Sequence, residues 1–271
     1  MKRIPIFQVD AFADRPFEGN PAAVCLLGEW LPARVLQAIA EENNLPETAF
    51  LGPTSPDDSG SHYHIRWFTP RVEVDLCGHA TLAAAWIVFH RLNAPYLELR
   101  LQSASGLLTV NRDDRRLTLD FPQDTLEPYE LPPWVVAALG VQPVTAFRGR
   151  DVLVVVGTQS EVETLEPDLS ALSKLKSRGV IVTAPGDNVD FVSRFFAPAA
   201  GIPEDPVTGS AHCALTPYWA GILGRRRLKA RQVSRRGGDL DCEWIGDRVL
   251  ISGRATLVLE GELFIPDELL Q

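Results

Sequence analysis

The strongest constraint on the fold of this chain is an internal repeat. The segment Ile65–Pro70 is matched by Ser193–Pro198, with Arg66 and Arg194 in the same place at an offset of 128 residues (194 minus 66). Self-similarity at a fixed offset is the sequence signature of a duplicated structural unit. We therefore expect two related halves.

The resemblance continues beyond each of these segments. A polar loop follows, then a glycine, Gly78 or Gly209, and then an apolar run of helical length, Leu82–Leu92 or Cys213–Leu223. Alternating, Gly-punctuated strands come after the helix in both halves. Each copy is thus strand, loop, glycine, helix and strands, which predicts an α/β (α+β) fold built from two pseudo-symmetric lobes.

The best boundary between the lobes is the Pro- and acid-rich stretch Asp124–Pro133. We expect an N-terminal lobe over 1–124 and a C-terminal lobe over 125–264. The final strand near Leu263 and the tail 265–271 are expected to return to the first lobe. With 271 residues, 45% of them apolar, the chain can bury a core in each lobe.

Local signals place several elements. Leu31-Pro32 opens a helix that Asn43-Asn44 closes, and Gly140 caps a short helix over Trp134–Leu139. The predicted strands are Thr48–Leu51, Val152–Val156, Val180–Thr183 and Val189–Phe196.

Charge and hydropathy exclude several classes of partner. The net charge of −9 and the pI near 5.1 argue against binding to nucleic acid or to anionic lipid, both of which require excess Lys and Arg. No apolar run reaches the roughly 18–20 residues of a membrane span, and the amino terminus turns polar too early for a signal peptide. A cytoplasmic protein with a small soluble partner is expected.

Cysteine and histidine spacing predicts no metal site. The four cysteines, Cys25, Cys77, Cys213 and Cys242, lack CxxC spacing and are expected to be thiols without disulfides. His62 and His64 share one strand face, but no third ligand follows at a suitable spacing. No Gly-rich phosphate loop is present, and the basic cluster from Arg225 to Arg236 is expected to pair with acidic side chains.

The two glycine-led helix starts carry the chemistry. Small residues at Gly78 and Gly209 leave the backbone N–H groups of the first turn open to a ligand, and the helix dipole favours an anion there. If the lobes face each other, both starts meet at one cleft that binds a substrate carboxylate or an enolate. The alternative is that each glycine only eases helix packing.

Four strings together resemble the PhzF family, the phenazine-biosynthesis-like isomerases. They are Phe17–Val24, Glu47–Phe50, Cys77–Thr81 and Asp205–His212, and they occur in the order found in the family. The resemblance spans nearly the whole chain. It implies the diaminopimelate epimerase-like fold, in which each lobe is a strongly curved, mostly antiparallel sheet or barrel around a central helix, and it suggests a homodimer.

What the resemblance implies about function is a cofactor-independent isomerase. In it Glu47 lifts a proton from carbon and returns it at another position, in the interlobe cleft. His79, Asp205 and Ser210 match positions that line that active site. A carboxylate works as a carbon base near pH 7 only if desolvation raises its pKa, and the residues around Glu47 are apolar.

Each of these residues also has an ordinary structural interpretation. Glu47 taken alone is a solvated loop charge, and His79 is a first-turn residue bonded to a loop rather than one that positions a substrate or relays a proton. Asp205 is a residue suited to capping the next helix. Asn20 and Cys77, which the resemblance implies bind the substrate, would be a turn residue and a packed thiol in this interpretation.

Two alternative functions stay open. In the related racemases two cysteines act as base and acid; Cys77 stands where the first would be, but the matched position of the second half holds Asp205, and Cys213 packs one turn into the helix. The other alternative is a non-catalytic member of the fold that binds a metabolite or a protein. The loop Thr54–Ser61 is one of those expected to select the substrate, whose identity the sequence does not specify.

Overall fold

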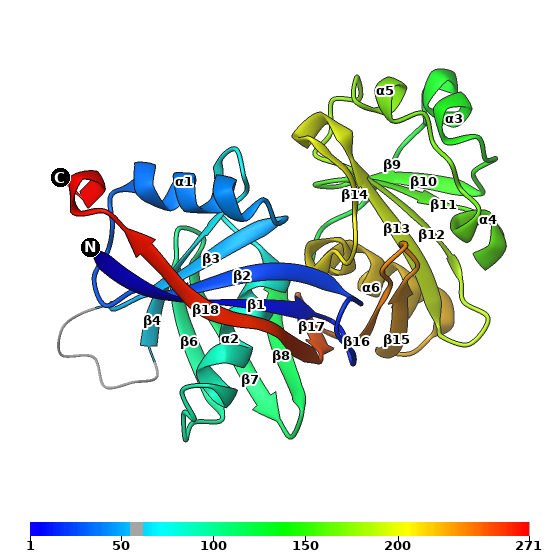
Figure 1. Ribbon diagram of the computed structural model, residues 1–271. Coiled ribbons are helices and arrows are strands. Elements are labelled where there is room, and N and C mark those ends of the chain that lie inside the picture. Colours follow the sequence, from blue (N-terminus) through cyan, green and yellow to red (C-terminus); the bar gives the residue numbers. More distant parts are fainter. Residues whose placement is uncertain (55–61, 271) are drawn as a thin grey trace. The chain divides into compact units, whose positions relative to one another are not determined.

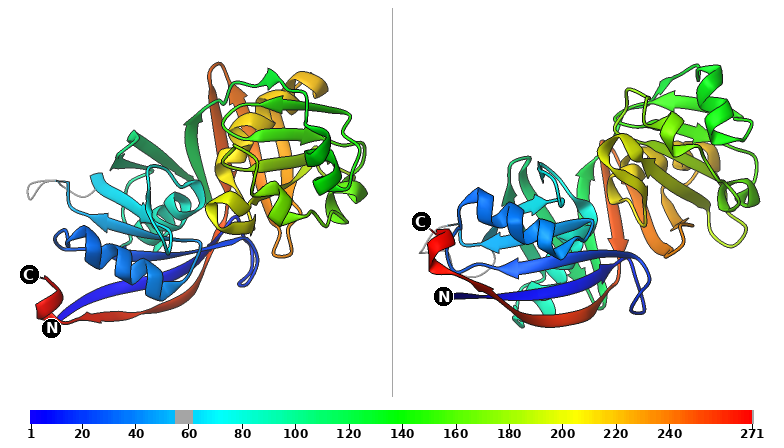
Figure 2. Two further views of the ribbon diagram at one scale, coloured as in Figure 1. Left: turned by 90° about the horizontal axis from the view of Figure 1, so that it is seen from above. Right: turned by 45° about the horizontal axis from the view of Figure 1, so that its top comes forward.

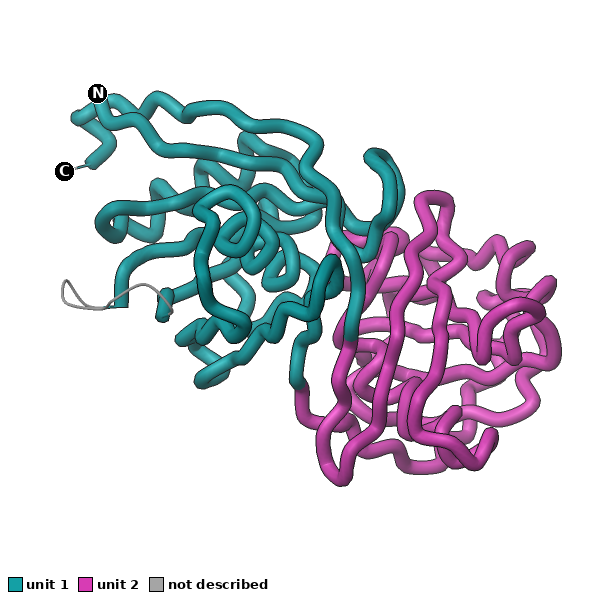
Figure 3. Tube along the Cα trace, turned by 90° about the horizontal axis from the view of Figure 1, so that it is seen from below, with its two compact units in different colours: residues 1–120, 252–271 teal, residues 121–251 magenta. Residues whose placement is uncertain are grey.

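A computed structural model describes residues 1–54 and 62–270, so most of the predicted substrate-selecting loop lies outside the described residues. The chain forms two compact units, residues 1–120 with 252–271 and residues 121–251 (Figures 1 and 3). The return to unit 1 begins at Ser252, earlier than the predicted residue 265. The reason is that a long terminal strand pairs with the first strand along its whole length.

Among its described residues, unit 1 contains nine strands, most of them paired antiparallel, and two α-helices. Its strands are β1 (Lys2–Ala11), β2 (Asn20–Leu26), β3 (Glu47–Gly52), β4 (His62–Phe68), β5 (Glu73–Val74), β6 (Glu98–Ser103), β7 (Gly106–Asp113), β8 (Arg116–Pro122) and β18 (Ala255–Ile265). Strand β18 runs antiparallel to β1 from the Lys2–Ile265 pair to the Ala11–Ala255 pair, as Figures 1 and 2 show. A short 3₁₀ helix, Asp267–Leu270, follows it.

Helix α2 (Gly78–His90) is the central helix of unit 1. Eleven of its thirteen residues are buried, from Gly78 to Phe89 with Trp86 as the half-exposed exception. A helix that is apolar on all sides must be surrounded by protein. Helix α1 (Ala33–Asn43) instead buries one face, Val35, Leu36, Ile39 and Ala40. It ends at Asn44, whose φ of 48° is the left-handed C-cap that asparagine tolerates.

Unit 2 repeats this plan with shorter strands and more helices. Its strands are β9 (Glu127–Pro128), β10 (Thr145–Arg148), β11 (Val152–Val155), β12 (Val180–Pro185), β13 (Phe191–Ala197), β14 (Ile202–Asp205), β15 (Arg227–Gln232), β16 (Gly238–Ile245) and β17 (Arg248–Gly253). Its helices are α3 (Pro133–Leu139), α4 (Gln159–Glu163), α5 (Leu169–Leu172), the 3₁₀ turn Pro198–Ala200 and α6 (Gly209–Leu223). Helix α6 takes the place of α2 and also buries most of its residues.

The pairing of the strands confirms the internal repeat. In unit 1, β2–β3 and β4–β6 are parallel and β3–β4 is antiparallel. In unit 2, β11–β12 and β13–β15 are parallel and β12–β13 is antiparallel. Each of the matched arginines pairs with a residue of the preceding strand, Arg66 with Phe50 and Arg194 with Val182.

The repeated arginines also make the same contacts. Arg66 donates two hydrogen bonds to Glu73, at 2.6 and 2.7 Å, and Arg194 donates two to Glu204, at 2.7 and 3.0 Å. Each guanidinium also lies over the aromatic ring two residues further along its strand, Phe68 or Phe196. The duplication thus extends to side-chain geometry.

Other local predictions are confirmed. Gly140 caps α3 with φ 70°, and all four cysteines are buried and outside disulfides. The basic cluster does pair with acids: Arg225 with Asp190, Arg227 with Glu243, and Arg231 with Asp239. Within the described residues, no helix is both long and apolar enough to cross a membrane.

Candidate functional site

Glu47 lies at the start of a buried strand rather than in a solvated loop. It is the first residue of β3, where its backbone pairs with Ala22 of β2. The strand begins soon after the cap of α1, and every following residue, Thr48 to Gly52, is buried. The side chain of Glu47 is 12% exposed. The carboxylate therefore sits at the edge of the core, with limited access to water.

His79 joins Glu47 to two further predicted residues. Its Nε2 lies 3.2 Å from Glu47 Oε2. On the other side of the ring, Nδ1 lies 3.1 Å from Asn20 Nδ2 and 3.5 Å from Cys77 Sγ. Unit 1 thus brings together Asn20, Glu47, Cys77 and His79 from β2, β3 and the start of α2.

The protonation of His79 follows from its surroundings. Burial lowers its pKa to about 3, so the imidazole is neutral at neutral pH. An amide N–H of Asn20 donates to Nδ1, which places the ring proton on Nε2. Nε2 lies 3.2 Å from Glu47 Oε2 without hydrogen-bond geometry. Because the imidazole is neutral, this contact is not an ion pair.

The start of α2 has no side-chain cap. Cys77 is the N-cap residue, in an extended conformation with φ −144°, and its side chain makes no cap hydrogen bond. The Thr81 hydroxyl donates to the Cys77 carbonyl at 2.5 Å, which ties the first turn together. Gly78 follows the cap and is buried. The first-turn N–H groups here have no intrahelical acceptors, as the anion-site prediction requires.

Asp205 belongs to a buried network in unit 2. It ends β14, is 8% exposed and accepts a hydrogen bond from Thr208 Oγ1 at 2.5 Å. The N-cap residue of α6 is Thr208, not Asp205. Gln232, fully buried on β15, accepts from Thr208 N at 2.8 Å and donates to the Asp205 carbonyl at 2.7 Å. Gln232 was not predicted, because it follows a basic, exposed-looking run.

Ser210 lies in the first turn of α6, next to Gly209. Its Oγ accepts a hydrogen bond from Arg178 Nη2 at 3.0 Å. Arg178 donates both Nε and Nη2 to Asp151, which is 3% exposed, and its guanidinium stacks over Phe195. Arg178 was also missed, since a lone arginine before a strand carries no sequence signal.

The repeat relates the two sets of residues. Glu47 precedes Phe50 by three residues, and Gly179 precedes the matched Val182 by three, so Arg178-Gly179 occupies the place of Pro46-Glu47. By the offset of the helix starts, Ser210 matches His79. Glu47 thus corresponds to Gly179, and the arginine of unit 2 lies one residue earlier, while Ser210 stands where unit 1 has His79. Convergence of the two helix starts on one cleft stays a prediction.

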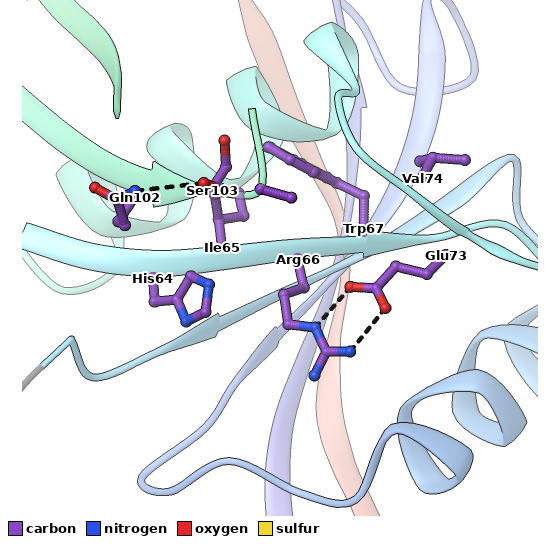
Figure 4. A pocket seen from close by; sticks show the side chains of 9 residues that line it. His64, Ile65, Arg66, Trp67, Glu73, Val74, Gln102 and Ser103 are labelled. Carbon is purple, nitrogen blue, oxygen red and sulfur yellow. Dashed lines mark hydrogen bonds and ion pairs between the residues drawn. The ribbon is translucent and has the colours of Figure 1, made fainter. Parts of the chain in front are cut away.

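A separate pocket of about 260 Å³ lies at β4, between β5 and β6 (Figure 4). Arg66 and Glu73 line it and are bonded to each other, while the His64 ring packs against Trp30 at 4.8 Å. Burial and the nearby Arg66 charge lower the pKa of His64. None of the predicted site residues lines this pocket.

Among the described residues, side chains that can bind a metal ion gather at Glu47, Cys77 and His79 rather than at this pocket. One group of three, Glu47, Cys77 and His79, has ligand atoms that all lie within 4.8 Å of one another. The sequence spacing did not predict it, because Glu47 comes from β3 and the other two from the start of α2. His62 and His64 belong to no such group among the residues that the structure describes.

The chain matches known proteins over nearly its full length. The family described as phenazine biosynthesis-like protein, PhzC-PhzF, matches residues 9–261. An uncharacterized isomerase of Pseudomonas aeruginosa is 51% identical over 262 residues, which cover 97% of this chain and 99% of that protein. The crystal structure of a PhzF-family protein of Enterococcus faecalis has a TM-score of 0.93 at 47% identity, covering 97% of this chain and 100% of that one. A predicted epimerase of P. aeruginosa, 24% identical over 97% of this chain and 100% of its own, has a TM-score of 0.72 and shares the fold.

Proposed function

The chain belongs to the phenazine biosynthesis-like (PhzC-PhzF) family and is an isomerase, and from this premise we propose that it moves a proton on a small carboxylate-bearing substrate with Glu47 as the acid/base. The observation that carries the proposal is the 3.2 Å contact between Glu47 Oε2 and His79 Nε2 in a largely buried site. A positioned carboxylate near the core is the kind of group that takes a proton from carbon.

The proposed reaction has two proton transfers. The Glu47 carboxylate takes a proton from one carbon of the substrate, and the resulting carboxylic acid returns it to another, so that the double bond or the configuration changes. Neutral His79 beside the carboxylate does not give Glu47 a proton, so the base stays available for the first step. Side chains alone perform this chemistry, and no cofactor is part of the proposal.

Negative charge on the substrate would be held by the helix starts. An enolate or carboxylate at Gly78 meets first-turn N–H groups and the positive end of the α2 dipole. Gly209 and Ser210 provide the same kind of environment at α6, where Arg178 contributes a cationic donor. Asp205, held by Thr208 and Gln232, is proposed as the catalytic partner on unit 2.

The direct test is incorporation of solvent deuterium into small carboxylic acids. Glu47→Gln keeps the shape of the side chain and removes the base, so exchange and turnover should fall by about 10² to 10⁴-fold. Glu42→Gln, an exposed position at the end of α1, is the matched control and should leave exchange unchanged. Deuterium exchange that persists in Glu47→Gln would show that another residue is the base.

A thiol mechanism is the second candidate, and the 3.5 Å contact of Cys77 Sγ with His79 Nδ1 favours it. A histidine within reach of a cysteine is the arrangement that activates a thiolate. Cys77→Ala distinguishes the two mechanisms, because it would abolish deuterium exchange if the thiol were the base. If Glu47 is the base, Cys77→Ala should retain most of the exchange rate.

A further inference from the structure

The site of unit 1 combines three side chains of different metal-ligand chemistry. A carboxylate oxygen of Glu47, the Sγ of Cys77 and an imidazole nitrogen of His79 all lie within 4.8 Å of one another. The three side chains are largely buried, with Glu47 at its edge 12% exposed. Thiolate, imidazole and carboxylate are the ligands from which zinc sites in proteins are built.

Two of the separations are in the range found between neighbouring zinc ligands, although they involve different ring nitrogens of His79. Zinc binds nitrogen, oxygen and sulfur at about 2.0–2.3 Å, which places neighbouring ligand atoms roughly 3.3–3.8 Å apart. Here Glu47 Oε2 and His79 Nε2 are 3.2 Å apart, and Cys77 Sγ and His79 Nδ1 are 3.5 Å apart. The two contacts use opposite ring nitrogens, so a cation on Nε2 requires a rotation of the Cys77 side chain.

The surroundings support the Nε2 side of the ring. Asn20 Nδ2 contacts Nδ1 at 3.1 Å and holds the orientation of the ring. A cation on Nε2 requires the ring proton on Nδ1, so the Asn20 side chain must turn its amide oxygen to Nδ1 and accept from it, as an outer-shell partner of a metal-binding histidine does. Binding also needs the Cys77 thiol to lose its proton to solvent, so one proton is released for each ion bound.

We propose that Glu47, Cys77 and His79 bind a thiophilic divalent cation such as Zn²⁺, and that this cation inhibits the isomerase. The inhibition rests on the proposed function, since a cation on Glu47 takes up the lone pairs that the base needs. Binding of the cation does not rest on it. A sulfur ligand favours Zn²⁺ and Cd²⁺ over Mg²⁺ and Ca²⁺, which prefer oxygen.

The test measures binding without turnover. Cd²⁺ added to the intact protein should produce the ultraviolet charge-transfer absorption of a cadmium–thiolate bond, saturating at one ion per chain. Cys77→Ala should remove this absorption and weaken Zn²⁺ binding, measured against a chromophoric chelator, by more than about tenfold, since even loss of an outer-shell partner costs 10 to 100-fold. Cys213→Ala, a buried cysteine of α6, is the matched control and should bind like wild type.

A second measurement guards against a misfolded variant. Competition for Zn²⁺ between the wild-type protein and the chromophoric chelator, with Mg²⁺ as the oxygen-preferring control, needs no substitution at all. Absence of the absorption and of competition in the wild type, or an absorption that survives in folded Cys77→Ala, would overturn the metal site. Binding without loss of deuterium exchange would overturn the inhibition, whereas an unchanged exchange rate in Glu47→Gln would refute only the proposed function.

Discussion

Ser210, which corresponds to His79 of unit 1, accepts a hydrogen bond at 3.0 Å from Arg178, one residue before the position that corresponds to Glu47. The two units keep the same strand order and the same helix start, yet one has an acid with a neutral imidazole and the other a cationic donor with a hydroxyl. The duplicated scaffold thus carries different side chains in its two halves.

Arg178 is expected to affect substrate binding. Arg178→Lys keeps the charge but loses the planar fork that contacts Asp151 and Ser210 together, so KM should rise by about tenfold with a smaller effect on kcat. Steady-state kinetics measure this split. Arg227→Lys, an exposed position paired with Glu243, is the control, and equal KM values in the two variants would contradict the assignment.

Gln232 is expected to hold Asp205 and the start of α6 in place. Gln232→Ala removes the acceptor for Thr208 N and the donor to the Asp205 carbonyl, and it leaves buried polar groups without partners. The free energy of unfolding should fall by about 2–4 kcal/mol. Denaturant titration measures the loss, with Gln102→Ala, exposed on the corresponding strand β6, as the control. A loss no larger than that of the control would show that the network is dispensable.

The repeated arginines should differ in their contribution to stability. Arg194 is 12% exposed and bonds Glu204 and the carbonyls of Val162 and Leu165. Arg66, 23% exposed, hydrogen-bonds Glu73 and no backbone carbonyl among the described residues. Arg194→Met should lower the free energy of unfolding by about 3 kcal/mol and Arg66→Met by about 1 kcal/mol. Denaturant titration of both variants tests this; a reversed order would contradict the role of the carbonyl contacts.

His212 is expected to make stability depend on pH. Burial lowers its pKa to about 4, against about 6.5 in the unfolded chain. Between these values only the unfolded chain takes up the proton, so the free energy of unfolding decreases as pH falls below 6.5. At pH 5 the loss from this group is about 2 kcal/mol.

The variant His212→Gln should remove that part of the pH dependence. Denaturant titration at pH 7 and pH 5 should show a drop about 2 kcal/mol smaller than in wild type. His62→Gln, on β4 at a half-buried position, is the control and should keep the wild-type drop. An unchanged drop in His212→Gln would mean that other groups cause the acid sensitivity.

Much of the fold could be predicted from sequence because the signals are local or repeated. Pro32, Asn44 and Gly140 mark helix ends through backbone preferences that act within a few residues. The match between residues 65–70 and 193–198 predicted a duplication that the strand registers confirm. The early return of the chain at Ser252 was not predicted, because pairing of β18 with β1 is a long-range event without a local signal.

The candidate site was predicted in part. Asn20, Glu47, Cys77 and His79 were named from motifs, and the structure brings them together. Arg178 and Gln232 were missed because their partners, Asp151, Ser210, Asp205 and Thr208, are distant in sequence and lie on other elements. The metal-ligand group was missed for the same reason, since no spacing rule connects residue 47 with residues 77 and 79.

By itself the sequence determined the duplication, the buried central helices and the residues available for chemistry, because periodicity, capping preference and side-chain type are properties of short segments. Only the tertiary structure decided which of those residues touch. The contact of Glu47 with His79, the neutral state of the imidazole and the contact of Arg178 with Ser210 in the other half all depend on burial and strand register. Both arise from packing between segments far apart along the chain.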